Sequence, residues 1–278
     1  MIKDEDLKQA VDYSEGQKTA AYMGLCEIVN LLNEFADNIR IIGGWVPALL
    51  YPDSDHIGSI DVDVLLNQLE IKNAESYMPF KRLLVQNGFV KHPEKYFTFV
   101  KTVVVQGVSY DVDVDFLSGK YGGDGGNVSK HIDGIKALPA TGGNFAFEFP
   151  PTDVKIEYMR PDGALDSGHV NVISIVPYLV MNAMALGRGK PKDAYDIYCT
   201  IDNYPGGVKT LAAEFIPYID KELVQKMKEK LQDKFASIDH AGPADIVSFL
   251  GTTDEDEIAR VKQDAYQKVH FLVNKLEL

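Results

Sequence analysis

Residues 59–66 read Ser-Ile-Asp-Val-Asp-Val-Leu-Leu, and residues 110–117 read Tyr-Asp-Val-Asp-Val-Asp-Phe-Leu. In both stretches apolar and acidic residues alternate with a period of two, which predicts β-strands whose carboxylates share one face. The carboxylates on these faces are Asp61 and Asp63 in the first stretch and Asp111, Asp113 and Asp115 in the second. Charged residues are depleted inside strands, so their placement in two apolar strands indicates a functional reason.

Carboxylates gathered in this way repel one another and raise each other's pKa unless a cation lies between them. Hard divalent cations prefer such oxygen ligands, and Mg²⁺ is typically held by a few carboxylates together with substrate phosphates. An antiparallel sheet with one solvated face would show the same alternation without any site. The repetition on two strands, preceded by Gly43-Gly44, favours the cation site.

Gly43 and Gly44 lie between a predicted strand over residues 39–42 and a predicted short helix over residues 45–50. A backbone without Cβ can approach phosphate oxygens closely and offer them its N–H groups. The helix N-terminus adds a favourable potential for an anion. The glycine pair is a weak signal alone, and beside the carboxylate strands it predicts a phosphate site.

Hydrophobic periodicity predicts the remaining elements. Further helices are expected over residues 5–36, 75–87, 177–186, 193–201, 222–235 and 255–276. Further strands are expected over residues 96–105, 108–117, 145–149, 154–159 and 169–173, the first two joined as a hairpin at Gln106-Gly107. The glycine-rich residues 121–127 predict a flexible loop on the substrate side.

These elements predict an α/β protein with a small mixed β-sheet flanked by helices, followed by a helical C-terminal domain. We expect the first domain over residues 1–173 and the second over residues 174–278. Cys26 and Cys199 lie in apolar surroundings and are expected to be buried free thiols.

The net charge limits the classes of binding partner that the chain can have. The 278 residues include 28 Lys and Arg against 41 Asp and Glu, a net charge of −13. This balance argues against a broad basic surface that coats nucleic acid, and it leaves room for a local basic groove. The sequence shows no signal peptide and no apolar run near the ~20 residues of a membrane span. We therefore expect a cytoplasmic protein without a membrane partner.

The motifs resemble a known superfamily. Gly43-Gly44, Asp61-Val62-Asp63 and Val114-Asp115-Phe116-Leu117 are similar, in kind and order, to the signature of the nucleotidyltransferases related to DNA polymerase β. Residues 190–198, Lys-Pro-Lys-Asp-Ala-Tyr-Asp-Ile-Tyr, resemble the Lys-Asp-x-x-Asp helix of the AbiEii-type nucleotidyltransferases. Those proteins are the toxin side of type IV toxin–antitoxin pairs.

The resemblance implies a nucleotidyltransferase fold and an enzyme that moves a nucleoside monophosphate from an NTP to an acceptor hydroxyl, releasing pyrophosphate. Asp61 and Asp63 would hold two Mg²⁺ ions, for which Mn²⁺ is an alternative. A third carboxylate would complete the second metal site and help to deprotonate the acceptor. Asp115 best matches the family segment, and Asp113, which faces the same way, is the alternative.

The resemblance also implies nucleotide contacts. Gly43 and Gly44 would cradle the triphosphate. The other implied nucleotide-binding residues are Lys190, Lys192, Asp193 and Asp196. Early-helix acidic residues are also common as simple helix-start features, because they favour the helix dipole. His56 precedes Asp61 in the chain and could touch substrate, whereas the six histidines show no spacing typical of metal ligands.

One position departs from the family. Asn182 stands where relatives carry a lysine that neutralises triphosphate charge. Lys190 or Lys192 would then take over that role, or the chain would be a catalytically weakened nucleotide-binding or interaction module. The acceptor stays open among a compact RNA end such as that of a tRNA, a protein and a small molecule. A cognate antitoxin is a further expected partner.

Overall fold

The computed structural model describes residues 9–73, 79–119, 130–132, 134–160 and 163–276. The chain forms two compact units. The sheet unit comprises Ser14–Leu50 and Gly58–Pro177, and the helical unit comprises Met1–Tyr13, Tyr51–Ile57 and Tyr178–Leu278. The main division follows Pro177, and the segment Tyr51–Ile57 belongs with the C-terminal helices. The predicted loop over residues 121–127 lies outside the described residues.

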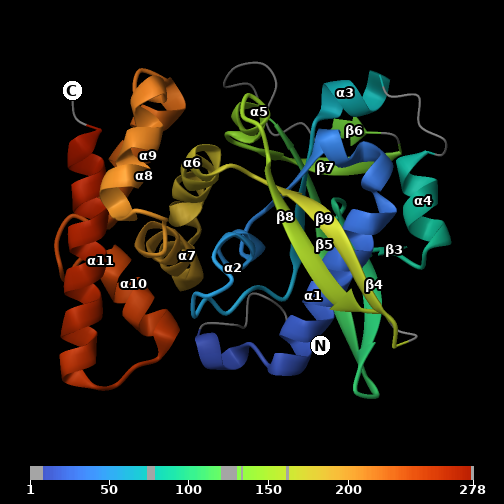
Figure 1. The fold of residues 1–278 in the computed structure, drawn as a ribbon, viewed down its shortest axis with the longest axis horizontal. Helices are drawn as coiled ribbons and strands as arrows, with labels where there is room; N and C mark the ends of the chain where they lie inside the picture. The colour runs from blue at the N-terminus through green and yellow to red at the C-terminus, as the bar shows by residue number, and fades with distance from the viewer. Residues whose placement is uncertain (1–8, 74–78, 120–129, 133, 161–162, 277–278) are drawn as a thin grey trace. The chain divides into compact units, whose positions relative to one another are not determined.

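The sheet unit is built on a mixed β-sheet with the strand order β3-β4-β5-β2-β1-β9-β8, and β7 pairs with β5 and β6 (Figure 1). The strands are β1 Ile39–Ile42, β2 Val62–Leu66, β3 Val90–Lys91, β4 Thr98–Val105, β5 Val108–Gly119, β6 Lys130–Ile132, β7 Ile135–Ala140, β8 Thr152–Met159 and β9 Leu165–Val172. Strand β5 runs parallel to β2 and β7 and antiparallel to β4. The chain is therefore an α/β protein with a mixed open sheet, as the sequence predicted.

Strands β4 and β5 form the predicted hairpin. Val105 pairs with Val108, and the two residues between them, Gln106 and Gly107, have φ angles of 50° and 80°. Positive φ at both central residues is typical of a type I′ turn, whose twist matches that of the flanking strands. The hairpin fixes the register that aligns β4 with the carboxylate face of β5.

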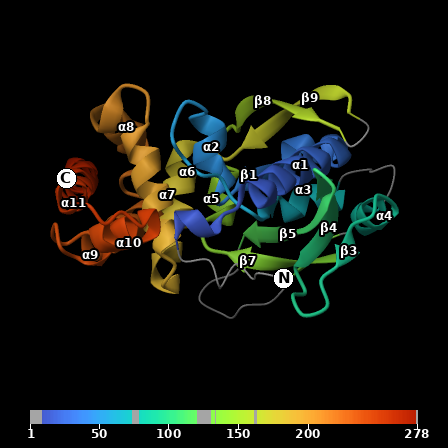
Figure 2. The same ribbon diagram turned by 90° about the horizontal axis from the view of Figure 1, so that it is seen from below.

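Helices cover the sheet. The helices of this unit are α1 Glu15–Leu31, α2 Trp45–Leu50, α3 Gln68–Asn73, α4 Phe80–Gln86 and α5 Gly143–Ala146. Helix α1 begins at a capping box in which Ser14 Oγ accepts a hydrogen bond from the backbone N–H of Gln17. It packs on β4 and β5 (Figure 1), where a Cβ at Gly24 would come 3.0 Å from Val112 Cγ1. Figure 2 shows α4 beside the edge strand β3.

The predicted strand over residues 145–149 is wrong, because α5 occupies Gly143–Ala146. Phe145, Phe147 and Phe149 alternate as in a strand, yet Phe145 and Phe149 pack edge to face with ring centroids 4.9 Å apart. Helix α5 ends before Phe149, and the turn that follows it brings the two rings together. Gly142, with φ of 86°, starts the turn.

The helical unit carries most of the remaining helices. Helix α6 Ile175–Ala185 leads into it, followed by α7 Pro191–Asp202, α8 Gly207–Phe215, α9 Glu222–Lys234, α10 Ala241–Leu250 and α11 Glu255–Lys275. Short 3₁₀ turns of this unit lie at Ala10–Asp12, Leu186–Arg188 and Ile216–Tyr218, and another, Asn33–Asn38, lies in the sheet unit. The core of this unit is apolar and includes Leu211, Phe215, Leu231, Phe249 and Val269. Helices α8 and α10 were not predicted, because Gly206-Gly207 and Gly242-Pro243 indicate breaks rather than helix starts.

The structure also bears on the two cysteines and on membrane-spanning helices. Cys26 and Cys199 are buried free thiols, as expected. Within the described ranges, no helix combines the length and the apolar character that a bilayer crossing needs.

Candidate active site

The parallel pair β2–β5 places two of the predicted carboxylates side by side. Asp63 is the register partner of Asp115. Neighbouring strands lie about 4.8 Å apart, and directly opposed side chains leave the sheet on the same face. Asp63 and Asp115 therefore lie next to each other on one face of the sheet.

Asp61 belongs to the same group. Ser59 Oγ donates a hydrogen bond to Asp61 Oδ1 at 2.5 Å, and Trp45 Nε1 donates one to the Asp61 carbonyl oxygen at 2.9 Å. The negative charge of Asp61 also acts on Asp115 and raises its pKa. All three predicted metal carboxylates, Asp61, Asp63 and Asp115, thus come together at the junction of β2 and β5.

The pKa of Asp115 is raised well above the ordinary value of a carboxyl group. Burial raises its pKa to about 7, and Asp61 and Asp113 add to the rise. A hydrogen bond from Thr98 Oγ1 to Asp115 Oδ1, at 2.5 Å, and the charge of Lys95 act in the opposite direction. Burial therefore favours the protonated form of Asp115. A bound divalent cation would relieve this electrostatic cost.

The structure distinguishes Asp113 from Asp115. Asp113 Oδ2 accepts a hydrogen bond from Lys95 Nζ at 2.9 Å and forms an ion pair with it. Asp111, farther along the same strand, accepts a hydrogen bond from Thr102 Oγ1 at 2.6 Å and is exposed. Among Asp111, Asp113 and Asp115, only Asp115 is paired with Asp63 in the β2–β5 register.

The turn formed by Gly43 and Gly44 joins β1 to α2. Gly43 has φ of 72°, and a Cβ at this position would collide with the carboxylate of Asp63. The absence of a side chain is therefore required at Gly43 both by the backbone angle and by the close approach of Asp63. The turn lies directly against the carboxylate group, which is where a phosphate cradle would have to lie.

The donor set fits a hard cation that arrives with phosphate. Among the residues that the structure describes, no group of three or more His, Cys, Asp or Glu side chains is arranged to hold a metal ion by itself. Mg²⁺ is commonly held by one or two carboxylates and completes its shell with water and substrate phosphates. Asp61, Asp63 and Asp115 supply oxygen ligands of this kind, and burial together with the charge of Asp61 raises the pKa of Asp115.

A second polar cluster lies in the helical unit, around α7. The buried carboxylate of Asp196 accepts hydrogen bonds from Lys192 Nζ at 2.7 Å and from His56 Nε2 at 2.9 Å. Burial alone would raise the pKa of Asp196, but Lys192 and His56 hold it below its ordinary value. Burial also lowers the pKa of His56, so its ring is neutral at pH 7. An ionised carboxylate only accepts, so His56 Nε2 carries the hydrogen.

Asp193 is also paired within the helical unit. Arg188 donates from Nη2 to Asp193 Oδ1 at 2.7 Å and from Nε to Oδ2 at 3.3 Å. Burial raises the pKa of Asp193 even though Arg188 opposes the rise. Lys190 precedes α7 as its N-cap residue, and its carbonyl oxygen accepts from the Asp193 N–H at 3.1 Å. The expected nucleotide contacts of these residues stay predictions.

Asn182 lies on α6, one turn after Tyr178. The Asn182 Nδ2 and Tyr178 hydroxyl groups are both buried. Asn182 brings no charge to this position.

Several residues at these clusters were not predicted from the sequence. They are Ser59, Lys95, Thr98 and Arg188. Ser59 could have been found, because it lies two residues before Asp61 and therefore on the same side of an extended chain. Lys95 and Thr98 reach the carboxylates only through the register of β4 on β5, which the sequence does not reveal.

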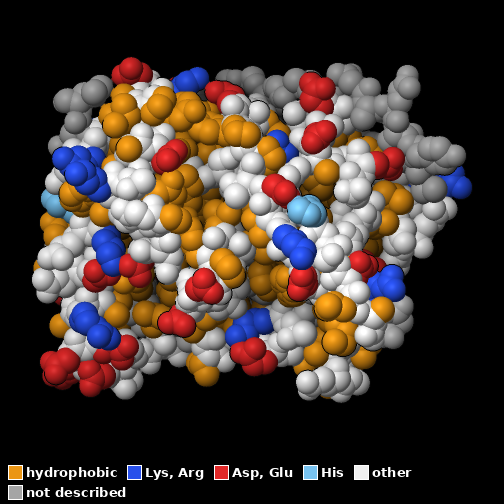
Figure 3. Space-filling view, viewed as in Figure 1, with side chains coloured by type: hydrophobic (Ala, Val, Ile, Leu, Met, Phe, Trp, Pro, Cys, Tyr) orange, Lys and Arg blue, Asp and Glu red, His pale blue; other side chains and the backbone are white. Residues whose placement is uncertain are grey.

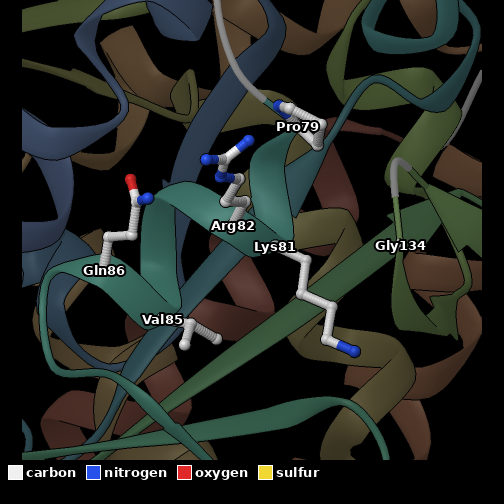
Figure 4. Close-up of a pocket in the computed structure, with 6 residues that line it drawn as sticks. All are labelled: Pro79, Lys81, Arg82, Val85, Gln86 and Gly134. Atoms are coloured by element: carbon white, nitrogen blue, oxygen red, sulfur yellow. The ribbon is translucent and has the colours of Figure 1, made fainter.

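A separate groove lies at α4, away from any of the predicted site residues. Its lining residues are Pro79, Lys81, Arg82, Val85, Gln86 and Gly134 (Figure 4). Lys81 and Arg82 make it locally basic. On the face shown in Figure 3, acidic and basic side chains are interspersed rather than gathered into one basic field, as the net charge predicts.

Comparison with protein-family models, with curated proteins and with solved structures found no match to this chain.

Proposed function

We propose that the sheet unit carries the active site of a Mg²⁺-dependent nucleotidyltransferase, of the nucleotidyltransferase fold and similar to the AbiEii type. The enzyme would transfer a nucleoside monophosphate from an NTP to an acceptor hydroxyl and release pyrophosphate. The single observation that carries the proposal is the register pairing of Asp63 with Asp115 on parallel strands. The charge of Asp61 beside them and the Gly43 turn against Asp63 support it.

Each residue would have a distinct task. Asp61 and Asp63 would hold the metal, with Asp115 completing the set. When bound, Mg²⁺ supplies stabilisation of negative charge on the phosphoryl oxygens. Ser59 and Thr98 orient two of the carboxylates through their hydroxyl groups, so little rearrangement is needed on binding.

Asp115 also suits the proton transfer. The ionised carboxylate of Asp115, beside the acceptor hydroxyl, would accept its proton as the new bond forms. The acceptor oxygen then bonds to the α-phosphorus while the bond from that phosphorus to the pyrophosphate oxygen breaks. The proton moves to Asp115, and the electron pair of the broken bond leaves with pyrophosphate.

The net charge of the chain bears on the class of acceptor. The net charge of −13 favours a compact acceptor, such as one RNA end or a small cationic molecule, over a long nucleic-acid footprint. A protein acceptor remains an alternative. An antitoxin encoded beside this chain is part of the same proposal, because it follows from the AbiEii resemblance.

The second candidate function is a nucleotide-binding or interaction module that has the same fold and weakened chemistry. The uncharged Asn182, with its buried Nδ2 group, favours this alternative. NTP binding without pyrophosphate release would establish it in place of the enzyme.

The deciding experiment measures pyrophosphate release with each of the four NTPs, with Mg²⁺ or Mn²⁺, and with total tRNA or an aminoglycoside panel as acceptor. We expect release with one NTP and one acceptor class, and we expect Asp63→Asn to abolish it while the fold is retained. Asp153→Asn, an exposed carboxylate on β8, is the control and should release pyrophosphate like the wild type. Full activity in Asp63→Asn would overturn the proposal.

A further inference from the structure

Lys95 lies in the loop that enters β4, and this loop is firmly held. His92 Nδ1 accepts hydrogen bonds from the backbone N–H groups of Glu94, at 3.1 Å, and Lys95, at 3.0 Å. The carbonyl oxygen of Phe97 accepts from the N–H of Phe116 on β5 at 2.9 Å. The backbone of Lys95 is therefore positioned before any ligand arrives.

The Lys95 side chain is directed to the carboxylate group. Its Nζ donates to Asp113 Oδ2 at 2.9 Å, and its charge also interacts with Asp115 and Asp61. The side chain remains 41% exposed, so the ammonium group is in contact with solvent as well. A lysine with a flexible stem and a partly solvated head can change its partner at small cost.

The excess of negative charge around Lys95 favours a cation in contact with the bound nucleotide. Asp61, Asp63, Asp113 and Asp115 are four carboxylates beside one ammonium group. A triphosphate adds further negative charge, which bound Mg²⁺ offsets only in part. Charge-assisted hydrogen bonds from a lysine are a common way to hold such phosphate oxygens.

We propose that Lys95 is the triphosphate-binding cation of this site and that its ammonium group moves from Asp113 to the phosphate oxygens when the nucleotide binds. This inference rests on the proposed nucleotidyltransferase function. It makes Asp113 a positioning residue that holds Lys95 ready rather than a metal ligand. It also supplies, from the sheet unit, the positive charge that Asn182 lacks.

Calorimetric titration with NTP and with inorganic tripolyphosphate, both in Mg²⁺, tests the inference. Loss of a charge-assisted hydrogen bond should make Lys95→Ala bind both ligands about 10- to 100-fold more weakly. Lys95→Arg retains the charge and should remain within about threefold of the wild type. The control is Lys155→Ala, which removes an exposed Lys–carboxylate pair with Glu157 on β8 and should bind normally.

A double variant separates binding from folding. Lys95→Ala leaves Asp113 without its ion-pair partner, which alone could lower the melting temperature. Lys95→Ala combined with Asp113→Asn removes both charges and should restore the melting temperature without restoring tripolyphosphate binding. Recovery of binding in the double variant would overturn the inference, because the effect of Lys95 would then be structural.

The outcomes distinguish this inference from the proposed function. Wild-type binding that is lost in Asp63→Asn and unchanged in Lys95→Ala would overturn the role of Lys95 and leave the proposed function standing. A wild-type protein that binds neither ligand would overturn the proposed function and, with it, the role of Lys95.

Discussion

Thr98 and Asp115 are register partners on β4 and β5, and the Thr98 hydroxyl donates to Asp115 Oδ1 at 2.5 Å. Thr98 is fully buried, so this hydrogen bond competes little with water. Burial raises the pKa of Asp115, and the hydrogen bond from Thr98 lowers it. A single hydroxyl thus helps to decide whether Asp115 can serve as a metal ligand near neutral pH.

Thr98→Val should therefore raise the pKa of Asp115 further. We expect the Mg²⁺ concentration needed for half-maximal pyrophosphate release to rise several-fold at pH 7 and to recover above pH 8. Thr102→Val is the matched control, because Thr102 makes the equivalent contact with the exposed Asp111 on the same two strands. Equal shifts in the two variants would contradict the role of Thr98.

The raised pKa of Asp115 predicts a pH-dependent stability without metal. Because the folded protein holds this proton up to pH about 7, and the unfolded chain releases it near pH 4, Asp115 lowers the free energy of unfolding as pH rises between these values. Asp115→Asn, which can still accept from Thr98, should be more stable than the wild type by up to about 4 kcal/mol above pH 7.

Urea unfolding between pH 4.5 and 8 measures this difference. The gain in unfolding free energy from Asp115→Asn should grow with pH, and Mg²⁺ should reduce it by stabilising the wild type alone. A gain that stays constant over this pH range would contradict the raised pKa.

Gly43→Ala should impair both folding and metal binding. The variant places an L-residue at φ of 72° and a Cβ against the carboxylate of Asp63. We expect a loss of about 1–3 kcal/mol in unfolding free energy and weaker Mg²⁺–NTP binding. Gly107→Ala also has a positive φ, of 80°, and has open space around it, so it isolates the backbone effect. Normal Mg²⁺–NTP binding in Gly43→Ala would show that the approach to Asp63 does not matter for the site.

His56→Phe should destabilise the helical unit. The His56 ring stacks on Tyr195 with ring centroids 5.2 Å apart, and its Nε2–H group satisfies the buried Asp196. Phenylalanine retains the stacking and removes the hydrogen bond, at a cost of about 1–3 kcal/mol. The control is His270→Phe, because His270 stacks on Tyr266 in the same geometry on an exposed helix face. Thermal melts of the two variants make the comparison, and a melting temperature of His56→Phe equal to that of the control would contradict the hydrogen-bond role.

The sequence predicted the carboxylate strands because alternation with period two has a direct physical meaning. It did not distinguish Asp113 from Asp115, because both lie on one face and only the pairing of β5 with β2 separates them. The same limit applies to Thr98, whose contact with Asp115 depends on the register of the β4–β5 hairpin.

Local patterns misled in two other places. The alternating phenylalanines at residues 145–149 indicated a strand, but the short helix α5 and the turn after it bring Phe145 and Phe149 into contact. Glycine and proline at the starts of α8 and α10 concealed two helices that the packed apolar core stabilises. In both cases tertiary packing overrode the local propensity.

Strand β5 changes its neighbour just after Asp115. Its pairing with β4 ends at Thr98–Asp115, and its pairing with β7 begins at Leu117–Leu138. Residues 92–97, which precede β4, are held by backbone hydrogen bonds and by the His92 ring, and they have no ladder partner within the described part of the chain. Substitutions in residues 92–97 can therefore change the position of the Lys95 ammonium group without shifting the Asp63–Asp115 register. Evolution could therefore retune ligand preference here while the chemistry of the strands stays constant.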